Sequence, residues 1–241
     1  MPSPKRPAHT VGADAGPPTA KGRATRERFR NALREAIAAD GYFNAKITDV
    51  VKRAEKSIGA FYNYYDSKED LLAEIAQDFN DELAQTTLQP FREGRPAEEA
   101  LSDAIRIFWM TFKRRKAEMV GVFQASMTDP RFSGEWRRIR GHALVRIVAG
   151  VRVAQAQGFA PGVDPELAAS ALASMLEHFA YVWLAGGGDD IKAPFDEERA
   201  IQTAAQLWYH ALYWKPSASD VAPPKATKAA KGPKVSQRKS K

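Results

Sequence analysis

The sequence predicts an all-α fold, and three observations support this prediction. Large apolar residues recur every three or four positions through most of residues 29–214. We find no convincing alternation of apolar and polar residues, the pattern of a half-buried strand, and no internal repeat. Residues that begin or end helices, such as Gly41, Ser57 and Pro96, stand next to the periodic segments. With 241 residues, the chain is long enough to bury a sizeable core.

Five segments carry a clear apolar stripe. The first ends at Gly41, the third follows Pro96, and the fourth stops near Gly158. The stripes predict amphipathic helices packed on a shared core. In chain order they are Phe29, Leu33, Ala36 and Ile37; Leu71, Ile75, Phe79 and Leu83; Leu101, Ile105, Phe108, Trp109 and Phe112; Trp136, Ile139, Ala143, Ile147 and Val151; and Ile201, Ala205, Trp208 and Leu212.

Residues 167–186 are apolar almost all round, which leaves two interpretations. Twenty mostly apolar residues have the length of a membrane span. Against a span, Glu177 and His178 lie near the centre, and alanines and serines dilute the hydrophobicity. We therefore expect no membrane contact, and a helix buried on two sides, by its own domain and by a partner subunit. Residues 197–214 are expected to lie beside it at the same subunit interface, with Trp208 and Leu212 in the contact.

The two ends of the chain are basic and poor in large apolar residues. Residues 1–28 hold six basic and two acidic residues, and residues 215–241 hold eight basic and one acidic. Such ends cannot bury enough surface to fold; they either solubilise the protein or attract a nucleic acid. We expect a disordered basic arm at 1–22 and a disordered basic tail at 215–241.

Composition argues against an enzyme and against a metal or cofactor site. The chain has no cysteine and four scattered histidines, so no metal-binding pair and no thiol nucleophile is expected. The absence of cysteine and of an apolar leader is consistent with the cytoplasm. Glu177 and His178 are adjacent and point about 100° apart on a helix, which favours a polar pair lining a pocket over acid–base chemistry. We predict no catalytic residue, no metal and no cofactor.

The segment SIGAFYNYYDSKEDLL, residues 57–72, follows a short amphipathic helix at 47–54. Ser57 is a good N-cap for a second short helix, and two short helices across a brief turn form a helix-turn-helix. Phe61 and Tyr65 are expected to pack inward, while the tyrosines between them point outward. In such a unit the second helix enters the major groove with its first residues at the bases. The predicted DNA-binding residues are Lys46, Thr48, Ser57, Ile58, Gly59, Ala60, Tyr62, Asn63, Tyr64 and Lys68.

From about Ala24 to Leu72, the chain resembles the TetR family of bacterial transcriptional repressors. The most specific part is FYNYYDSKEDLL, with its two aromatic pairs followed by Ser67, Lys68 and Glu69. The resemblance implies a homodimer on a palindromic double-stranded DNA operator, released when a small effector binds. It implies a helix-turn-helix DNA-binding domain at 23–66 and a helical effector-binding and dimerisation domain at 67–214. Two positions differ from the family pattern: Glu55 stands where the turn usually has glycine, and Lys56 where an aliphatic residue is usual. A non-glycine residue in a left-handed turn costs roughly 1 kcal/mol.

Aromatic and methionine residues are the evidence for an effector site. They come from five separate helical segments, and they are either plain core or the lining of an apolar tunnel. The spacing in residues 104–119 is similar to that of the ethionamide-resistance regulators within the same family, whose tunnels take long hydrophobic ligands. The predicted ligand residues are Phe108, Trp109, Phe112, Phe123, Met127, Trp136, Met175, Glu177, Phe179 and Trp183.

These observations predict a homodimeric repressor with a small hydrophobic effector. The alternative is an architectural protein that uses its basic tails to bind DNA without sequence choice. A helical hydrolase is a distant third.

Overall fold

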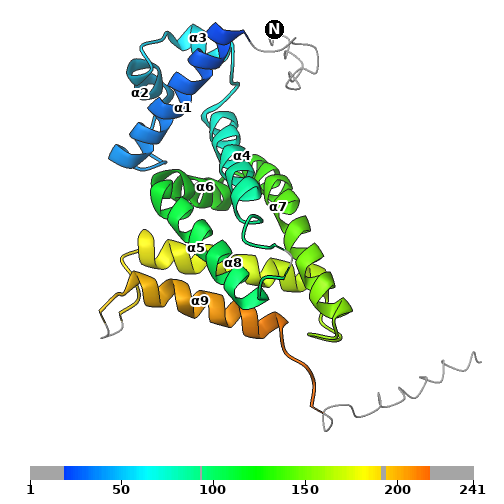
Figure 1. The fold of residues 1–241 in the computed structure, drawn as a ribbon. Helices are drawn as coiled ribbons and strands as arrows, with labels where there is room; N and C mark the ends of the chain where they lie inside the picture. The colour runs from blue at the N-terminus through cyan, green and yellow to red at the C-terminus, as the bar shows by residue number, and fades with distance from the viewer. Residues whose placement is uncertain (1–18, 93, 191–193, 218–241) are drawn as a thin grey trace, which may run out of the picture.

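A computed structural model describes residues 19–92, 94–190 and 194–217. These residues form α-helices and no strand, so the all-α prediction is confirmed (Figure 1). Most of the two expected basic tails, residues 1–18 and 218–241, lies outside the described residues. The helices are α1 (Ala20–Asp40), α2 (Ile47–Arg53), α3 (Ile58–Tyr62), α4 (Lys68–Thr86), α5 (Ala97–Arg114), α6 (Lys116–Thr128), α7 (Pro130–Ala156), α8 (Pro165–Leu184) and α9 (Glu197–Leu212).

Helix α1 begins three residues before the boundary expected at 23. The Thr19 hydroxyl accepts a hydrogen bond from the Gly22 amide at 3.1 Å, so Thr19 caps the helix. Ala20 to Gly22 therefore belong to the helix rather than to a disordered arm. At the other end, Gly41 has a φ of 76°, a conformation that glycine adopts without steric cost.

The first three helices form a small unit at one end of the molecule, and α4 leads from it into the other helices (Figure 1). In that larger group, α7 packs on α4, α6 and α8, while α9 packs on α5. Helix α1 also touches α4 and α6. The small unit is thus joined to the larger group of helices by packing contacts of α1 as well as by the chain connection into α4.

A break at Arg115 separates α5 from α6, and sequence periodicity did not show it. Arg115 leaves helical geometry with a φ of −103° and a ψ of 25°. Its guanidinium is buried, 2.8 Å from the Glu118 carboxylate, and it donates a 3.4 Å hydrogen bond to the Ile75 carbonyl of α4. A charged group reaching back to a neighbouring helix is a tertiary feature, which is why the apolar pattern did not reveal it.

Helix α8 is the one helix of the described residues long and apolar enough to cross a membrane by length and composition. Only 28% of its most apolar window is buried within the chain. Within one chain, α8 is therefore buried where it packs on α7, α5 and α6, and its remaining side is open.

The apolar stripe of α9 packs inside the chain. We expected Trp208 and Leu212 to lie beside α8 at a subunit interface, but they are 7% and 6% exposed in the chain's own core. The open side of α9 instead presents Gln202, Gln206 and Leu207.

Candidate nucleic-acid interface

The turn between α2 and α3 is built by local hydrogen bonds. The Asp49 carboxylate accepts from the Lys46 amide at the start of α2. The Ser57 hydroxyl accepts from the Ala60 amide at 3.1 Å, so Ser57 caps α3 as predicted. Between the helices, Glu55 has a φ of 54°, the left-handed conformation in which this turn usually has glycine. The chain therefore keeps the helix-turn-helix geometry without a glycine at this position.

The four aromatic residues at positions 61–65 divide between core and surface. Phe61 is fully buried, with its ring edge against Phe29 at 5.4 Å between centroids, and Tyr65 is 6% exposed. Burial raises the pKa of the Tyr65 hydroxyl above its ordinary value. Tyr62 is 52% exposed and Tyr64 is half-buried. The rings of Phe61 and Tyr65 thus fix α3 on α1, and Tyr62 is free to meet a partner.

Most of the predicted DNA-binding residues on and beside α2 and α3 are accessible to solvent. The side chain of Ile58, at the start of α3, is 47% exposed although it is aliphatic. An exposed helix start with small neighbours can approach another surface closely. The exposed members are Lys46, Thr48, Ser57, Ile58, Gly59, Tyr62 and Asn63; Ala60, Tyr64 and Lys68 are half-buried.

The ammonium of Lys68, which we expected to be free to reach DNA, is bound within the protein. Its ammonium donates hydrogen bonds to the carbonyls of Tyr42 at 2.9 Å and Ala45 at 3.0 Å. It also lies 4.0 Å from the centroid of the Tyr42 ring, and burial lowers the pKa of the ammonium. Lys68 therefore anchors the loop between α1 and α2, and a contact with DNA stays a prediction.

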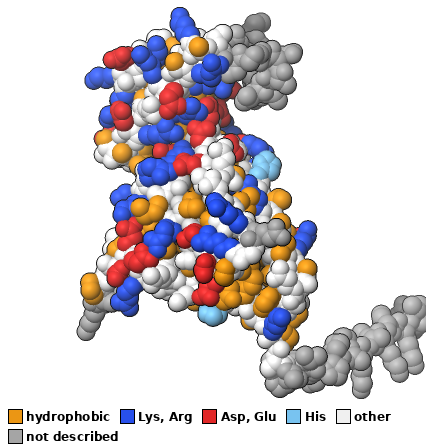
Figure 2. All heavy atoms as spheres, in the orientation of Figure 1, with side chains coloured by type: hydrophobic (Ala, Val, Ile, Leu, Met, Phe, Trp, Pro, Cys, Tyr) orange, Lys and Arg blue, Asp and Glu red, His pale blue; other side chains and the backbone are white. Residues whose placement is uncertain are grey.

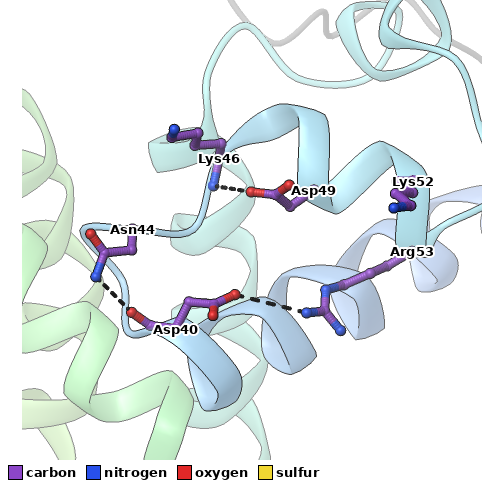
Figure 3. Close-up of a pocket in the computed structure, with 6 residues that line it drawn as sticks. All are labelled: Asp40, Asn44, Lys46, Asp49, Lys52 and Arg53. Atoms are coloured by element: carbon purple, nitrogen blue, oxygen red, sulfur yellow. Dashed lines mark hydrogen bonds and ion pairs between the residues drawn. The ribbon is translucent and has the colours of Figure 1, made fainter.

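Beside the start of α2 lies an open polar cleft of about 830 Å³ (Figure 3). The Arg53 guanidinium lies 3.8 Å from the Asp40 carboxylate across the cleft, and the Asn44 amide donates to the Asp40 carbonyl. Lys46 and Lys52 extend at its rim (Figure 3). Lys52 was not among the predicted DNA-binding residues. It lies one helical turn after Thr48 on α2, and this spacing could have placed it on the same side of the helix as Thr48.

Figure 2 shows Lys and Arg side chains over the α1–α3 end of the molecule, with acidic side chains between them. Some of the cations are neutralised locally: Arg28 lies 3.4 Å from the Glu55 carboxylate, for example. The cationic character of α2 and α3 therefore rests on a few side chains such as Lys46 and Lys52 rather than on a dense basic patch.

Comparisons with known proteins agree with this geometry. Residues 30–75 match the family described as bacterial regulatory proteins, tetR family, and this range spans the second half of α1, all of α2 and α3, and the start of α4. The chain belongs to the TetR family. As a member, it is a DNA-binding transcriptional regulator.

Relatives extend the likeness over the larger group of helices. The chain is 24% identical over 176 residues to YdgC of Bacillus subtilis, an uncharacterized helix-turn-helix-type regulator, covering 70% of this chain and 86% of YdgC. It superposes on the fatty acid degradation regulator FadR of Bacillus halodurans with a TM-score of 0.64 at 17% identity, covering 76% of this chain and 94% of FadR. For the TetR-family regulator PfmR of Thermus thermophilus, the TM-score is 0.59 at 22% identity, with 77% and 98% covered. At these identities the two structures show a shared fold alone.

In this TetR-family regulator, most of the predicted ligand residues lie in the core between α5, α6 and α8, where their rings contact one another in two groups. The rings of Trp109 and Phe179 are 5.6 Å apart between centroids, and those of Phe112 and Phe123 are 6.2 Å apart. Trp109 and Phe112 are fully buried. The rings pack on one another, and neither the cleft beside α2 nor a second cleft beside Arg114 and Arg115 is lined by them. We call this set of core residues the aromatic cluster. It consists of Phe108, Trp109, Phe112, Phe123, Met175, Phe179 and Trp183, and Trp136 lies in the same core.

Two predicted ligand residues have other surroundings. Met127 is 81% exposed at the end of α6, so the expectation that it lines an interior site is wrong for this structure. Glu177 forms a part-buried ion pair with Arg140 of α7, at 3.0 Å. One residue that the prediction missed is Phe195, whose ring stacks on Trp183 at 5.0 Å and covers Trp109. Its only sequence signal was an isolated phenylalanine in a polar loop before α9.

Proposed function

We propose that this regulator is a repressor, that it binds a palindromic operator as a homodimer, and that a small hydrophobic effector releases it. The observation that carries the DNA-binding part is the exposed surface of α3, which Phe61 fixes from behind. Ile58 and Gly59 at its start and Asn63 at its C-cap are open to solvent. In helix-turn-helix proteins this part of the second helix meets base edges in the major groove. Ile58, Gly59, Ala60 and Asn63 would read sequence, while Lys46, Thr48, Tyr62 and Tyr64 would hold phosphates.

The open side of α8 supports the homodimer. Leu167 is 71% exposed, and Ala171, Ser174 and His178 follow it on the same face. Small side chains let a second helix approach closely, and burial of apolar area contributes roughly 25 cal/mol per Å². With Leu207 on the open side of α9, two helices from each subunit would form a four-helix interface.

Selection of bound fragments from genomic and random DNA tests the proposal. At moderate salt the full chain is expected to enrich one short palindrome with half-sites about 34 Å apart, one helical turn. Sedimentation at micromolar concentration should give about twice the chain mass of 26.6 kDa. Uniform recovery of all fragments would instead support the architectural alternative, in which the basic tails bind DNA without sequence choice.

The aromatic cluster supports a mainly apolar effector. A large set of rings between α5, α6 and α8 offers contact area to an acyl chain or a polycyclic molecule rather than to a sugar or a nucleotide. FadR, which shares the fold, is named as a regulator of fatty acid degradation. Because the rings pack on one another, the effector would enter by displacing side chains, and the half-exposed Phe195 over Trp183 is the most accessible one. The regulator is expected to work in the cytoplasm, where its DNA is.

Long-chain fatty acids are expected to raise the melting temperature and to lower operator affinity. A ligand at 100 times its Kd stabilises the native state by about 2.7 kcal/mol. Trp183→Ala should reduce both effects, because the ring that faces Phe195 is gone. Trp214→Ala is the matched control, since Trp214 is a 41% exposed ring beyond the end of α9. Stabilisation by polar metabolites alone would show that the rings are plain core.

A further inference from the structure

Helix α6 touches helix α1 at two points one helical turn apart. The Glu118 carboxylate of α6 lies 3.0 Å from Nε of Arg34 on α1. One turn further along each helix, Gly121 of α6 faces Ile37 of α1. Residues three apart lie on the same side of a helix, so both contacts belong to one interface in a single register. This interface joins the helix-turn-helix unit to the larger group of helices.

Glu118 pairs with cations on both sides of that interface. One carboxylate oxygen faces Arg34, and the other lies 2.8 Å from Arg115 at the junction of α5 and α6. Glu118 and Arg115 are 7% and 8% exposed. A buried carboxylate that loses one of its cations is left poorly compensated, so the pairing resists a shift of α1 along α6.

Gly121 lets the two helices come together at the second point. A Cβ at position 121 would lie 3.1 Å from Cδ1 of Ile37 and 3.6 Å from Cβ of Tyr42. Ile37 and Tyr42 are each 4% exposed, so neither side chain can turn away into solvent. Glycine weakens a helix interior relative to alanine, and its backbone here is helical. The close approach of α1 is therefore the physical reason for glycine.

Helix α4 also holds the loop that follows α1, through Tyr42, a residue that lies against Gly121. The Tyr42 hydroxyl donates to the Glu69 carboxylate of α4 at 2.5 Å, and Lys68 of α4 binds the Tyr42 carbonyl. Tyr42 therefore lies between α6 and the start of α4. A displacement at Gly121 would act on α1 and on the loop that leads into α2.

We propose that Glu118 and Gly121 of α6 are positioning residues that set the orientation of the helix-turn-helix unit, and that side-chain volume at position 121 changes this orientation. The effect on DNA rests on the proposed operator binding, whereas the effect on orientation does not.

Distance measurements within one subunit test the proposal without DNA. The chain has no cysteine, so Arg28→Cys on α1 and Met110→Cys on α5 introduce two unique, exposed label sites. Spin-labelled protein mixed with excess unlabelled protein reports the distance inside one subunit. Gly121→Ala is expected to shift the main distance or broaden its distribution, Gly121→Val to do so more strongly, and Glu118→Gln to broaden it.

Gly150→Ala is the matched control, because Gly150 also lies inside a helix but a Cβ there meets nothing within 4 Å. It should leave the distance unchanged and raise the melting temperature by about 2–4 °C, the effect of better helix propensity. Unchanged distances in folded Gly121→Ala and Glu118→Gln overturn the proposal, even if Gly121→Val does not fold.

Operator affinity supplies the second measurement. Gly121→Val is expected to weaken operator binding by at least about 10-fold, the size of losing one good base contact, and Gly150→Ala to leave it unchanged. Distances that move in a protein that selects no operator would refute the proposed function and leave this proposal standing. Operator affinity that falls while the distances stay fixed overturns it.

Discussion

Replacing Lys46 and Lys52 together with alanine is expected to lower the affinity for every DNA sequence by about 60-fold at 0.1 M salt. Both side chains are exposed at the rim of the cleft beside α2. Each phosphate contact contributes a slope of about −0.9 to log K against log salt, so two contacts change the slope by about 1.8. Mobility-shift titrations with operator and with random DNA at two or more salt concentrations give affinity and slope together.

Two variants separate this effect from a change of net charge and from a change of fold. Lys116→Ala with Arg137→Ala removes two cations from the exposed surfaces of α6 and α7, and should leave the slope almost unchanged. Lys68→Ala should weaken binding with a smaller change of slope, because its ammonium holds the carbonyls of Tyr42 and Ala45. A double variant with wild-type slope would show that α2 does not face the phosphates.

Arg140→Met is expected to lower the free energy of unfolding by roughly 1–3 kcal/mol at pH 7. Arg140 of α7 binds the Glu177 carboxylate and the Ser174 hydroxyl of α8, and the charged side chains are only 18% and 20% exposed. Breaking a fully buried pair costs about 3–5 kcal/mol, and the partial exposure reduces this figure. Urea unfolding followed by circular dichroism measures the loss.

The loss should depend on pH with a defined sign. Burial raises the pKa of Glu177 above its ordinary 4.5, and the Arg140 guanidinium opposes this rise. Without Arg140 the native pKa rises further, so the native state holds its proton to higher pH than the unfolded state does. That proton stabilises the native state fully below about pH 4.5, and the stabilisation disappears as pH rises through the native pKa. Arg140→Met should therefore be destabilised less at pH 4.5 than at pH 7.

Arg152→Met is the matched control on the same two helices. Arg152 pairs with Glu166 across α7 and α8, but the two side chains are 62% and 59% exposed. An exposed pair contributes about 0–1 kcal/mol, so the change should be small and similar at both pH values. Equal losses in the two variants would contradict a special role for the Arg140–Glu177 pair.

Local patterns in the sequence determined much of the fold. Ser57 and Ser67 cap α3 and α4 because a serine hydroxyl satisfies a free amide within its own first turn, an interaction that needs no distant partner. The inward place of Phe61 and Tyr65 also followed from short-range spacing. The left-handed conformation of Glu55 was expected from the family resemblance, in which this position usually has glycine. The order of these residues resembled the TetR family, to which the chain belongs.

Tertiary structure decided what local spacing cannot express. The helix breaks at Arg115, whose guanidinium binds the Glu118 carboxylate and the Ile75 carbonyl of α4. Lys68 is held in place because its ammonium binds two carbonyls of a loop that is distant in the sequence. Whether Trp208 faced a partner or its own core depended on where α5 lay, since an apolar stripe specifies that a face is buried and not what buries it. Sequence alone did not distinguish Gly121 from the other glycines, because the need for a missing Cβ arises only where distant side chains, here Ile37 and Tyr42, pack against the helix.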